Sequence, residues 1–574
     1  MLTLDKQTQI QEDINRIEKN TRLFSILRFI LFVCIVIFVI CFITLDRFVL
    51  DLTLSLVFIA AFVGFVILTK PYYHKLKILK NLEVIYKKHE NRRKLSYQSF
   101  TPDGRELIDY TDYKEMDLDL IGPRSLFQYL CVAKSKEGKA KLARQLSNPI
   151  KKDERFTNCI RTFAEQEEVL KLEASISLIS ADAKDCDEQE LLGMAKKKIH
   201  ISTFGLILCA LSYILFITLL VVSLLKHIQL YYLFLFIPLN FFIARKTIQS
   251  EVFAFPSTKY ANLLSAYKKL ANDIINIKIE DPYFQELQAT IQKQYSSLAR
   301  FSHLLDMLSY RQNILLSIIG NGIFYMDYLM ALIYNQFTKR LDSFEACLDA
   351  LSEIELMLSL AVIGMDNEIY TIPEKGESFQ IIEGYHPLVK NCVPNSFVLK
   401  GGVILTGSNM SGKTTFMRML GLNQVLANAG GLVCAKSFST SDYTVVTSLR
   451  ANDMLQEGIS TFYAEVNRMQ KIMESSQEGR TLVLVDEIFK GTNAKDRIFA
   501  AREIIKKLNA FGVHFLITTH DFELCDAADI VNFHFDEEYI EDKISFDYKI
   551  KDGKCQKTNA IYLLKLAGVL DKNQ

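Results

Sequence analysis

Four long apolar stretches interrupt an otherwise polar chain. They cover residues 29–45, 48–69, 201–225 and 228–244, and Asp51, near one end of the second stretch, is their only charged residue. As a helix, each stretch is long enough to cross a hydrocarbon core about 30 Å thick. The pattern therefore predicts four membrane-spanning helices, and the alternative is four helices buried in a protein core.

The stretches come in two pairs, each joined by only two residues, which predicts two helical hairpins. Basic residues flank both hairpins, including Arg22 and Lys70 around the first and Lys198 and Arg245 around the second. Positively charged flanks stay in the cytoplasm. We therefore expect a multi-pass protein of a membrane, the bacterial inner membrane, with its soluble domains in the cytoplasm. A removable signal peptide is disfavoured because a second apolar stretch follows without a small-residue cleavage site.

A fifth apolar run, residues 314–334, differs from the other four. It carries Asn321 and Asp327 in its interior. A fifth crossing would also move the rest of the chain to the opposite side of the membrane. We therefore expect this run to be a buried helix of a soluble domain.

The remaining chain divides by its periodicity. Residues 114–200 and 245–370 have helical spacing and few Gly or Pro, whereas short β-like runs alternate with helical segments after residue 375. This alternation predicts an α/β nucleotide-binding domain. The expected organisation is a short N-terminal segment (1–22), a first hairpin (23–69), a basic juxtamembrane linker (70–113), a helical part (114–200), a second hairpin (201–244), a second helical part (245–375) and the α/β domain (376–574).

Composition changes this picture little. The chain has 574 residues, of which 49% are hydrophobic and 23% charged, which fits soluble domains joined to a few membrane helices. Lys and Arg (67) nearly balance Asp and Glu (66), so net charge gives no indication of nucleic-acid binding. The eleven Cys form no C-x-x-C pair, which disfavours a zinc site or a disulfide framework.

The strongest motif is a glycine-rich loop between a predicted strand and a predicted helix. Residues 407–415 read GSNMSGKTT and match G-x-x-x-x-G-K-[ST]. Such a loop wraps phosphates with backbone N–H groups at a helix N-terminus. Lys413 would reach the β- and γ-phosphates of ATP, and the Thr414 hydroxyl would ligate Mg²⁺. The full candidate set is Gly407, Ser408, Asn409, Met410, Ser411, Gly412, Lys413, Thr414 and Thr415.

Two later strands end in groups that complete such a site. The apolar run 481–485 leads into Asp486 and Glu487, and the run 515–519 leads into His520. Asp486 would hold Mg²⁺ directly or through water, and Glu487 would act as the general base for the attacking water. His520 could contact the γ-phosphate, although a lone His is often structural. The turn 458–462 (GISTF) could bind phosphate through Ser460, or it could simply cap the following helix.

Taken in this order and spacing, GSNMSGKTT, GISTFYAEV, LVLVDEIFKGTN and ITTHDFEL resemble the ATPase domain of the MutS mismatch-repair family, a branch of the ABC-type ATPases. The segment YHPLV at 385–389 is also similar. A weaker resemblance to the helical core of the family covers residues 117–149 and 290–370. The resemblance implies a P-loop ABC-type α/β ATPase domain, an all-α core and lever, and ATP with Mg²⁺ as ligands.

The resemblance also implies a homodimer in which each ATP lies between two subunits. Ser460 would then cap the γ-phosphate bound by the partner, and Asn493 would lie at the dimer seam. Asn409 and Met410 match positions of the family loop. Ser411 replaces a usual glycine, and Thr415 falls beside a usual serine or threonine position.

Two family features have no counterpart here. We expect no N-terminal domain that holds a mismatch-reading Phe-x-Glu motif, since the triplet 163–165 (FAE) falls in the predicted helical core. The second hairpin lies roughly where the family carries its DNA clamp. We therefore expect a membrane-anchored ATPase coupled to mismatched or branched DNA in repair or recombination. The alternative is a membrane mechanoenzyme that couples ATP-driven dimerisation to its hairpins or to a protein partner without DNA. An ABC transporter is a weaker alternative, because the spans show no polar pathway.

Overall fold

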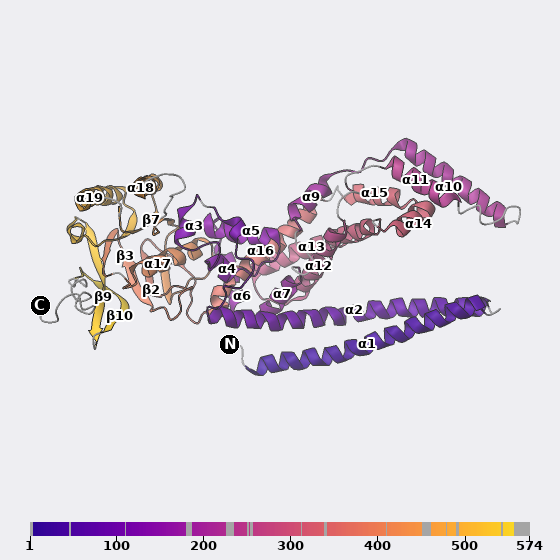
Figure 1. Cartoon of the computed structure of the whole chain (residues 1–574), viewed down its shortest axis with the longest axis horizontal. Coiled ribbons are helices and arrows are strands. Elements are labelled where there is room, and N and C mark those ends of the chain that lie inside the picture. Colours follow the sequence, from indigo (N-terminus) through magenta and orange to yellow (C-terminus); the bar gives the residue numbers. More distant parts are fainter. Residues whose placement is uncertain are drawn as a thin grey trace.

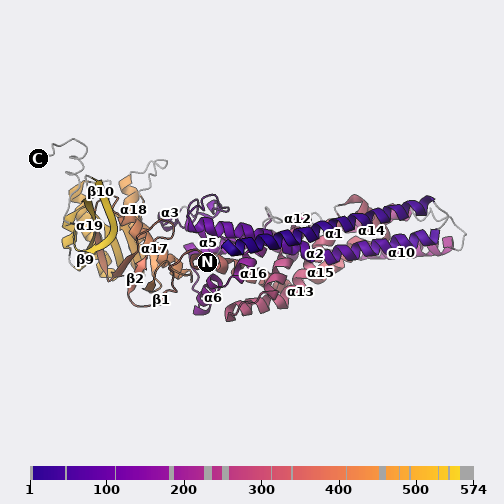
Figure 2. The same ribbon diagram turned by 90° about the horizontal axis from the view of Figure 1, so that it is seen from below.

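The computed structural model describes residues 4–44, 48–109, 111–179, 186–224, 235–248, 252, 257–311, 313–337, 341–408, 410–450, 461–477, 479–489, 493–527, 529–540 and 543–555. The chain forms an elongated molecule with its β-sheets at one end and its apolar helices at the other (Figure 1). Helices of a central all-α region join the two ends. The turned view gives the same arrangement (Figure 2).

The first hairpin consists of two long helices that pack along each other. These are α1 (Leu4–Thr44) and α2 (Phe48–Arg93), and both continue well beyond their apolar stretches. With a rise of about 1.5 Å per residue, α2 is more than twice as long as a hydrocarbon core is thick. Its polar half therefore extends to the helical region, where it packs against α7 (Glu168–Ser177) and α16 (Leu341–Asp366).

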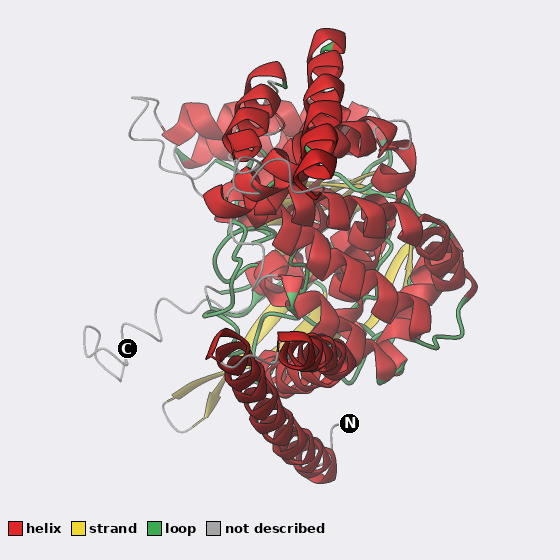
Figure 3. Ribbon diagram, turned by 90° about the vertical axis from the view of Figure 1, so that its right-hand side faces the viewer, coloured by secondary structure: helices red, strands yellow, loops and turns green. Residues whose placement is uncertain are grey.

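The helical region is built around α16. Its apolar side chains from Leu351 to Ile363 are almost all buried, and it packs against its neighbours in the region. These include α5 (Lys136–Ser147), α6 (Glu154–Glu165) and α13 (Pro282–Tyr310). The remaining helices here are α3 (Tyr113–Asp117), α4 (Leu126–Leu130), α9 (Glu188–Lys196) and α12 (Ser257–Asn276). Seen end-on, the helices lie in front of the strands (Figure 3).

A second group of apolar helices lies at the end far from the sheets (Figure 1). It contains α10 (Thr203–Leu224), α11 (Phe236–Thr247), α14 (Ile314–Phe324) and α15 (Met326–Phe337). Within the described ranges, three segments are long and apolar enough to cross a membrane: Thr8–Phe38, Thr53–Arg93 and Thr203–Ser223. The predicted fourth span, 228–244, begins outside the described residues, and α11 is the part that the structure describes.

The expectation of one buried helix over residues 314–334 is wrong. The run forms two helices, α14 and α15, bent by 87° at Tyr325, which has a left-handed backbone (φ 47°). Large apolar side chains on α14 are exposed, with Ile314 at 73% and Phe324 at 67%, whereas Asn321 and Asp327 are 1% exposed. The polar residues that suggested a soluble domain are thus the ones turned inward.

The C-terminal part contains two sheets. The smaller has the order β1 (Glu374–Lys375), β5 (Ser437–Thr440), β2 (Phe379–Gly384), β3 (Asn395–Leu399). The larger has the order β10 (Lys543–Asp552), β9 (Ile530–Ile540), β4 (Gly402–Thr406), β8 (His514–Thr518), β7 (Thr481–Asp486), β6 (Thr444–Ser448). All of its pairs are parallel except β9 with β10. The helices α17 (Lys413–Asn428), α18 (Thr461–Gln477) and α19 (Ala494–Phe511) alternate with its strands.

Candidate nucleotide site

The site forms where β4, β8 and β7 end side by side. Parallel strands bring their carboxyl ends to one edge of the sheet, which is where ligands bind in open α/β folds. The central strand β4 is buried along its whole length, and the glycine-rich loop follows it directly. Gly407 (φ 144°) and Gly412 (φ 102°) take backbone conformations that residues with a side chain rarely adopt, so the loop can fold back onto the start of α17.

Lys413 lies inside the glycine-rich loop. Its ammonium group donates hydrogen bonds to the carbonyl oxygens of Gly407 (2.7 Å) and Ser408 (2.8 Å). The buried Ser408 hydroxyl has no hydrogen-bond partner among the described residues. A charged donor and an unsatisfied buried hydroxyl thus face the same loop. This is the chemistry that a bound phosphate satisfies, because phosphate oxygens accept several hydrogen bonds at once.

Two side chains whose oxygen atoms could bind a cation meet beside the loop. The Thr414 hydroxyl donates a hydrogen bond to one carboxylate oxygen of Asp486 (2.9 Å), and the Thr518 hydroxyl donates to the other (2.5 Å). Hydroxyl and carboxylate oxygens are the ligands that Mg²⁺ prefers, and this ion usually takes few protein ligands and keeps several waters. The donor set therefore fits Mg²⁺. The sequence did not single out Thr518, which fixes Asp486 from the neighbouring strand.

Glu487 and His520 lie close together at the same edge. His520 Nε2 is 3.0 Å from a carboxylate oxygen of Glu487. The Glu487 backbone is left-handed (φ 57°), and its N–H donates to both the carbonyl (3.2 Å) and the hydroxyl (3.0 Å) of Thr518. These bonds hold Glu487 in an unfavourable conformation that turns its carboxylate away from the strand.

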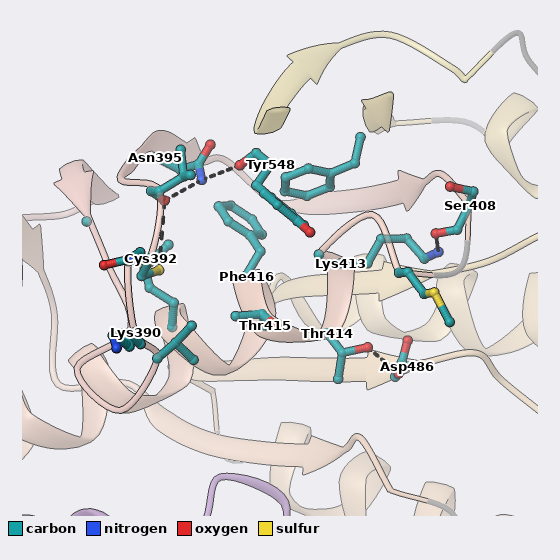
Figure 4. Close-up of a pocket in the computed structure, with 18 of the residues that line it drawn as sticks. Lys390, Cys392, Asn395, Ser408, Lys413, Thr414, Thr415, Phe416, Asp486 and Tyr548 are labelled. Atoms are coloured by element: carbon teal, nitrogen blue, oxygen red, sulfur yellow. Dashed lines mark hydrogen bonds between the residues drawn. The ribbon is translucent and has the colours of Figure 1, made fainter. Parts of the chain in front are cut away.

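A cavity of about 720 Å³ extends from the loop to an aromatic cluster. Its far end is lined by Phe416, Tyr548 and the segment from Val389 to Val393 (Figure 4). Asn395 attaches β10 to this segment, since its amide donates to the Tyr548 carbonyl (2.9 Å) and its side-chain oxygen accepts from the Ile550 N–H (2.9 Å). The cavity thus has a polar, cationic end and an aromatic end, as a nucleoside triphosphate requires.

His386, from the YHPLV segment, is buried behind the wall of the cavity. Burial and the nearby Arg418 lower the pKa of His386 to about 3, so the ring is neutral. Its Nδ1 accepts the Leu388 N–H (3.2 Å), and its own backbone N–H donates to Cys392 Sγ (3.3 Å). The role of His386 is therefore to fix the loop that lines the cavity.

The structure brings together most of the predicted site residues, and Met410, Ser411 and Thr415 also lie in or beside the loop. Asn409 and Ser460 lie outside the described residues. Asn493 caps α19, with its side-chain oxygen accepting the Asp496 N–H (3.0 Å). The sequence missed Tyr548, because an isolated aromatic residue in a strand far along the chain carries no local signal.

The fold and the site define an α/β domain with a glycine-rich loop after its central strand, joined to a long helical region. The family model for MutS domain V matches residues 403–572. The DNA mismatch repair protein MutS of Leptospira interrogans is 35% identical over 199 residues, which cover 33% of this chain and 23% of that protein. The same protein of Aquifex pyrophilus is 29% identical over 246 residues (40% and 28%), and MutS protein homolog 4 of Mus musculus is 29% identical over 239 residues (38% and 24%).

Residues 403–572 of this chain thus match domain V of the MutS family. The matches span about a quarter of the length of these relatives. The match to domain V lies within the α/β domain, and the apolar hairpins and the helical region lie outside it.

Proposed function

We propose that the α/β domain binds and hydrolyses ATP with Mg²⁺, and that the apolar helices anchor it in a membrane. The observation that carries the first part is the convergence of Lys413, the Thr414–Asp486 pair and the Glu487–His520 pair at one edge of the sheet. These residues come from three separate places in the chain, at 413–414, 486–487 and 520. Together they provide a hydrogen-bond donor for phosphate, a cation site and a general base within one cavity.

Each side chain has a definite task in this proposal. The loop N–H groups and Lys413 bind the phosphates, and Thr414 and Asp486 hold Mg²⁺, which would neutralise charge on the phosphate oxygens. Glu487 accepts a proton from the attacking water. His520, 3.0 Å from Glu487, orients that carboxylate. The aromatic end, with Phe416 and Tyr548, takes the adenine ring.

Membrane anchoring is supported by the pattern of exposure. The apolar segments of α1, α2 and α10 have large hydrophobic side chains on their surfaces, for example Phe32 (53% exposed), Leu68 (72%) and Phe204 (68%). A soluble protein rarely exposes apolar surface over helices of this length. We propose four spans in two hairpins, with 228–244 as the fourth and the soluble domains on the cytoplasmic side.

We further propose that the protein acts as a homodimer on DNA. The support is the relationship to proteins named for DNA mismatch repair, and the domain V motifs that the chain shares with them. In the proposed dimer, Ser460 and Asn493 of one subunit approach the nucleotide of the other.

A second candidate function is a membrane machine that needs no DNA. One observation favours it: buried charges join the polar end of α2 to two helices. His89 Nδ1 lies 2.7 Å from Asp366 of α16, and its Nε2 lies 2.9 Å from Glu173 of α7. This continuous helix links the membrane hairpin to the helical region that contacts the α/β domain. Movement of that domain would therefore be transmitted to the membrane.

The test is the ATPase rate of the full-length protein in detergent, with and without homoduplex, mismatched and branched DNA at low salt. Glu487→Gln should reduce the rate by about 10²-fold or more, while nucleotide binding persists, because only the base is lost. The matched control is Glu503→Gln, an exposed residue of α19 in the same domain, which should leave the rate unchanged.

The outcomes separate the proposals. A rate that DNA stimulates supports coupling to DNA, whereas a Glu487-dependent rate that is indifferent to every DNA supports the membrane machine. Equal rates for Glu487→Gln and the wild type would refute the assigned base. Absence of any nucleotide binding would refute the site itself.

A further inference from the structure

In the bent helix pair α14–α15, apolar and polar residues are arranged the opposite way round from those of a soluble protein. On the outside, α14 exposes Leu315 (71%), Ile319 (49%) and Phe324 (67%), and α15 exposes Leu329 (51%) and Leu332 (48%). A helix on the surface of a soluble protein buries its apolar residues and exposes its polar ones. The apolar face of this pair is therefore unexplained if water surrounds it.

The polar groups of the pair face inward and are paired. The Arg311 guanidinium lies 3.0 Å from both carboxylate oxygens of Asp327. The side-chain oxygen of Asn321 accepts the Asp327 N–H (2.9 Å), a backbone group that the bend leaves without a helical partner. Both Asn321 and Asp327 are 1% exposed. Polar side chains inside a bilayer behave in this way, facing the protein interior and pairing there.

A second buried amide joins the pair to the neighbouring apolar helices. Asn240 of α11 is 1% exposed. Its amide donates to the Gly322 carbonyl (2.8 Å), and its side-chain oxygen accepts from the Tyr325 hydroxyl (2.7 Å) and the Ser212 hydroxyl of α10. Non-helical backbone is tolerated at membrane depth only where protein satisfies it. Asn240 and Asn321 together satisfy the bend.

The packing between α11 and α14 is also close. A Cβ atom on Gly322 would lie 2.6 Å from Ile237 Cγ2 and 2.9 Å from its Cα, so only glycine fits there. Small residues that allow helix backbones to approach are typical of helix contacts in membranes. The outer side of α11 continues the apolar surface, with Leu239 at 50% and Phe242 at 69% exposure.

The chain enters and leaves the pair at the same place. Helices α13 and α16, which precede and follow it, pack together. Aromatic rings join them at the base. The ring of Phe301 of α13 stacks on that of Phe337 of α15 (4.2 Å between centroids) and meets that of Phe344 of α16 edge to face (5.0 Å). The pair therefore projects from this base and returns, and it does not carry the chain across a membrane.

We propose that α14 and α15 form a re-entrant element whose apolar outer face contacts the acyl chains of the bilayer. The inference rests on the proposed membrane anchoring and adds a fifth inserted segment to it. Lipid is the occupant that fits, because this face continues the exposed apolar surface of α11, whose partner α10 is itself long enough to span. The α/β domain stays on the cytoplasmic side because the element does not cross.

The test uses the absence of Trp from the natural sequence. Leu315→Trp and Phe324→Trp place a single indole on the outer face of α14, where the native side chains are already exposed. Phe32→Trp on α1 is the control for a membrane span, and Ile150→Trp (native side chain 70% exposed), near the α/β domain, is the control for water. Each full-length variant is reconstituted in phosphatidylcholine vesicles with and without brominated acyl chains.

We expect brominated lipid to quench Leu315→Trp and Phe324→Trp to the same fraction as Phe32→Trp, and to leave Ile150→Trp unchanged. If Phe32→Trp is quenched but both α14 variants are instead quenched by aqueous acrylamide, the proposal fails and anchoring stands. If neither quencher reaches them, a second copy or another protein covers the face, and the proposal also fails. If Phe32→Trp itself escapes lipid quenching, the anchoring and this element are both refuted.

Discussion

His89 is completely buried between two carboxylates where α2 meets the helical region. Asp366 lies 2.7 Å from one ring nitrogen and Glu173 lies 2.9 Å from the other, and all three side chains are at most 5% exposed. Burial by itself lowers the pKa of His89, but the two carboxylates outweigh it and raise the pKa from 6.5 to about 9. The ring is therefore a buried cation that fixes α2 to α7 and α16.

The pKa shift sets the size of the effect. A shift from 6.5 to about 9 corresponds to about 3 kcal/mol of stabilisation when His89 is protonated in both states. Because the pKa is raised on folding, this contribution is complete below about pH 6.5 and is lost as the pH rises through about 9. Between pH 6 and pH 8 it falls by about 2 kcal/mol.

Neighbouring charges change this value only slightly in the chosen range. Burial lowers the pKa of Lys88 to about 8, so its unfavourable contribution is relieved mainly above pH 8 and offsets only a small part of the His89 effect between pH 6 and pH 8. The opening of α2 from the helical region should therefore become about tenfold more favourable over this range.

The assay is amide hydrogen exchange of the full-length protein, followed on peptides from the polar end of α2. Protection factors, which correct for the intrinsic effect of pH on exchange, should fall about tenfold from pH 6 to pH 8 in the wild type. His89→Gln leaves two buried carboxylates without their partner and should cost about 3–5 kcal/mol. Replacing His89, Asp366 and Glu173 together by neutral amides should remove the pH dependence.

His74→Gln is the matched control on the same helix. His74 also pairs with a carboxylate, Asp273 at 3.2 Å, but both side chains are more than 20% exposed. A partly solvated pair contributes about 1 kcal/mol or less. The reasoning is refuted if the protection factors of wild-type α2 do not change between pH 6 and pH 8, or if His74→Gln costs as much as His89→Gln.

Three further predictions concern other contacts. Tyr548→Ala should weaken ATP binding by about fivefold in equilibrium titration, whereas Tyr548→Phe keeps the ring and should bind normally. Equal affinities of Tyr548→Ala and the wild type would show that Tyr548 does not contribute to the site. Asp117 accepts N–H bonds from Leu449 (2.9 Å) and Arg450 (3.1 Å) and pairs with Arg468. Asp117→Asn should therefore destabilise this junction by about 3 kcal/mol, which would be seen as faster amide hydrogen exchange in β6. Asp119→Asn is the control: its ion pair is more exposed, so the substitution should cost under about 1 kcal/mol. Gly322→Ala should destabilise α11 against α14 by about 1–3 kcal/mol in a thermal melt in detergent, while Gly193→Ala, where the added methyl meets nothing within 4 Å, should be tolerated.

The parts of the site that could be predicted are those in which neighbouring residues carry the chemistry. The glycine-rich loop needs its glycines, Lys413 and Thr414 in fixed succession, and Asp486 and Glu487 need a buried strand directly before them. The aromatic end could not be predicted, since Tyr548 reaches the cavity only because β10 pairs with β9 beside the loop. The orientation of Asp486 by Thr518 depends likewise on the register of β7 with β8.

The sequence by itself determined that the chain contains apolar helices long enough for a membrane and an α/β domain with a glycine-rich loop, because hydropathy and motif spacing are local properties. Only the tertiary structure decided which way the run 314–334 faces. Hydropathy identified its polar residues, but the bend at Tyr325 and the bonds from Asn240 turn those residues inward. It also decided that His89 is a buried cation, since its partners Glu173 and Asp366 lie 84 and 277 positions away in the chain, and burial that depends on such distant residues leaves no pattern in the sequence.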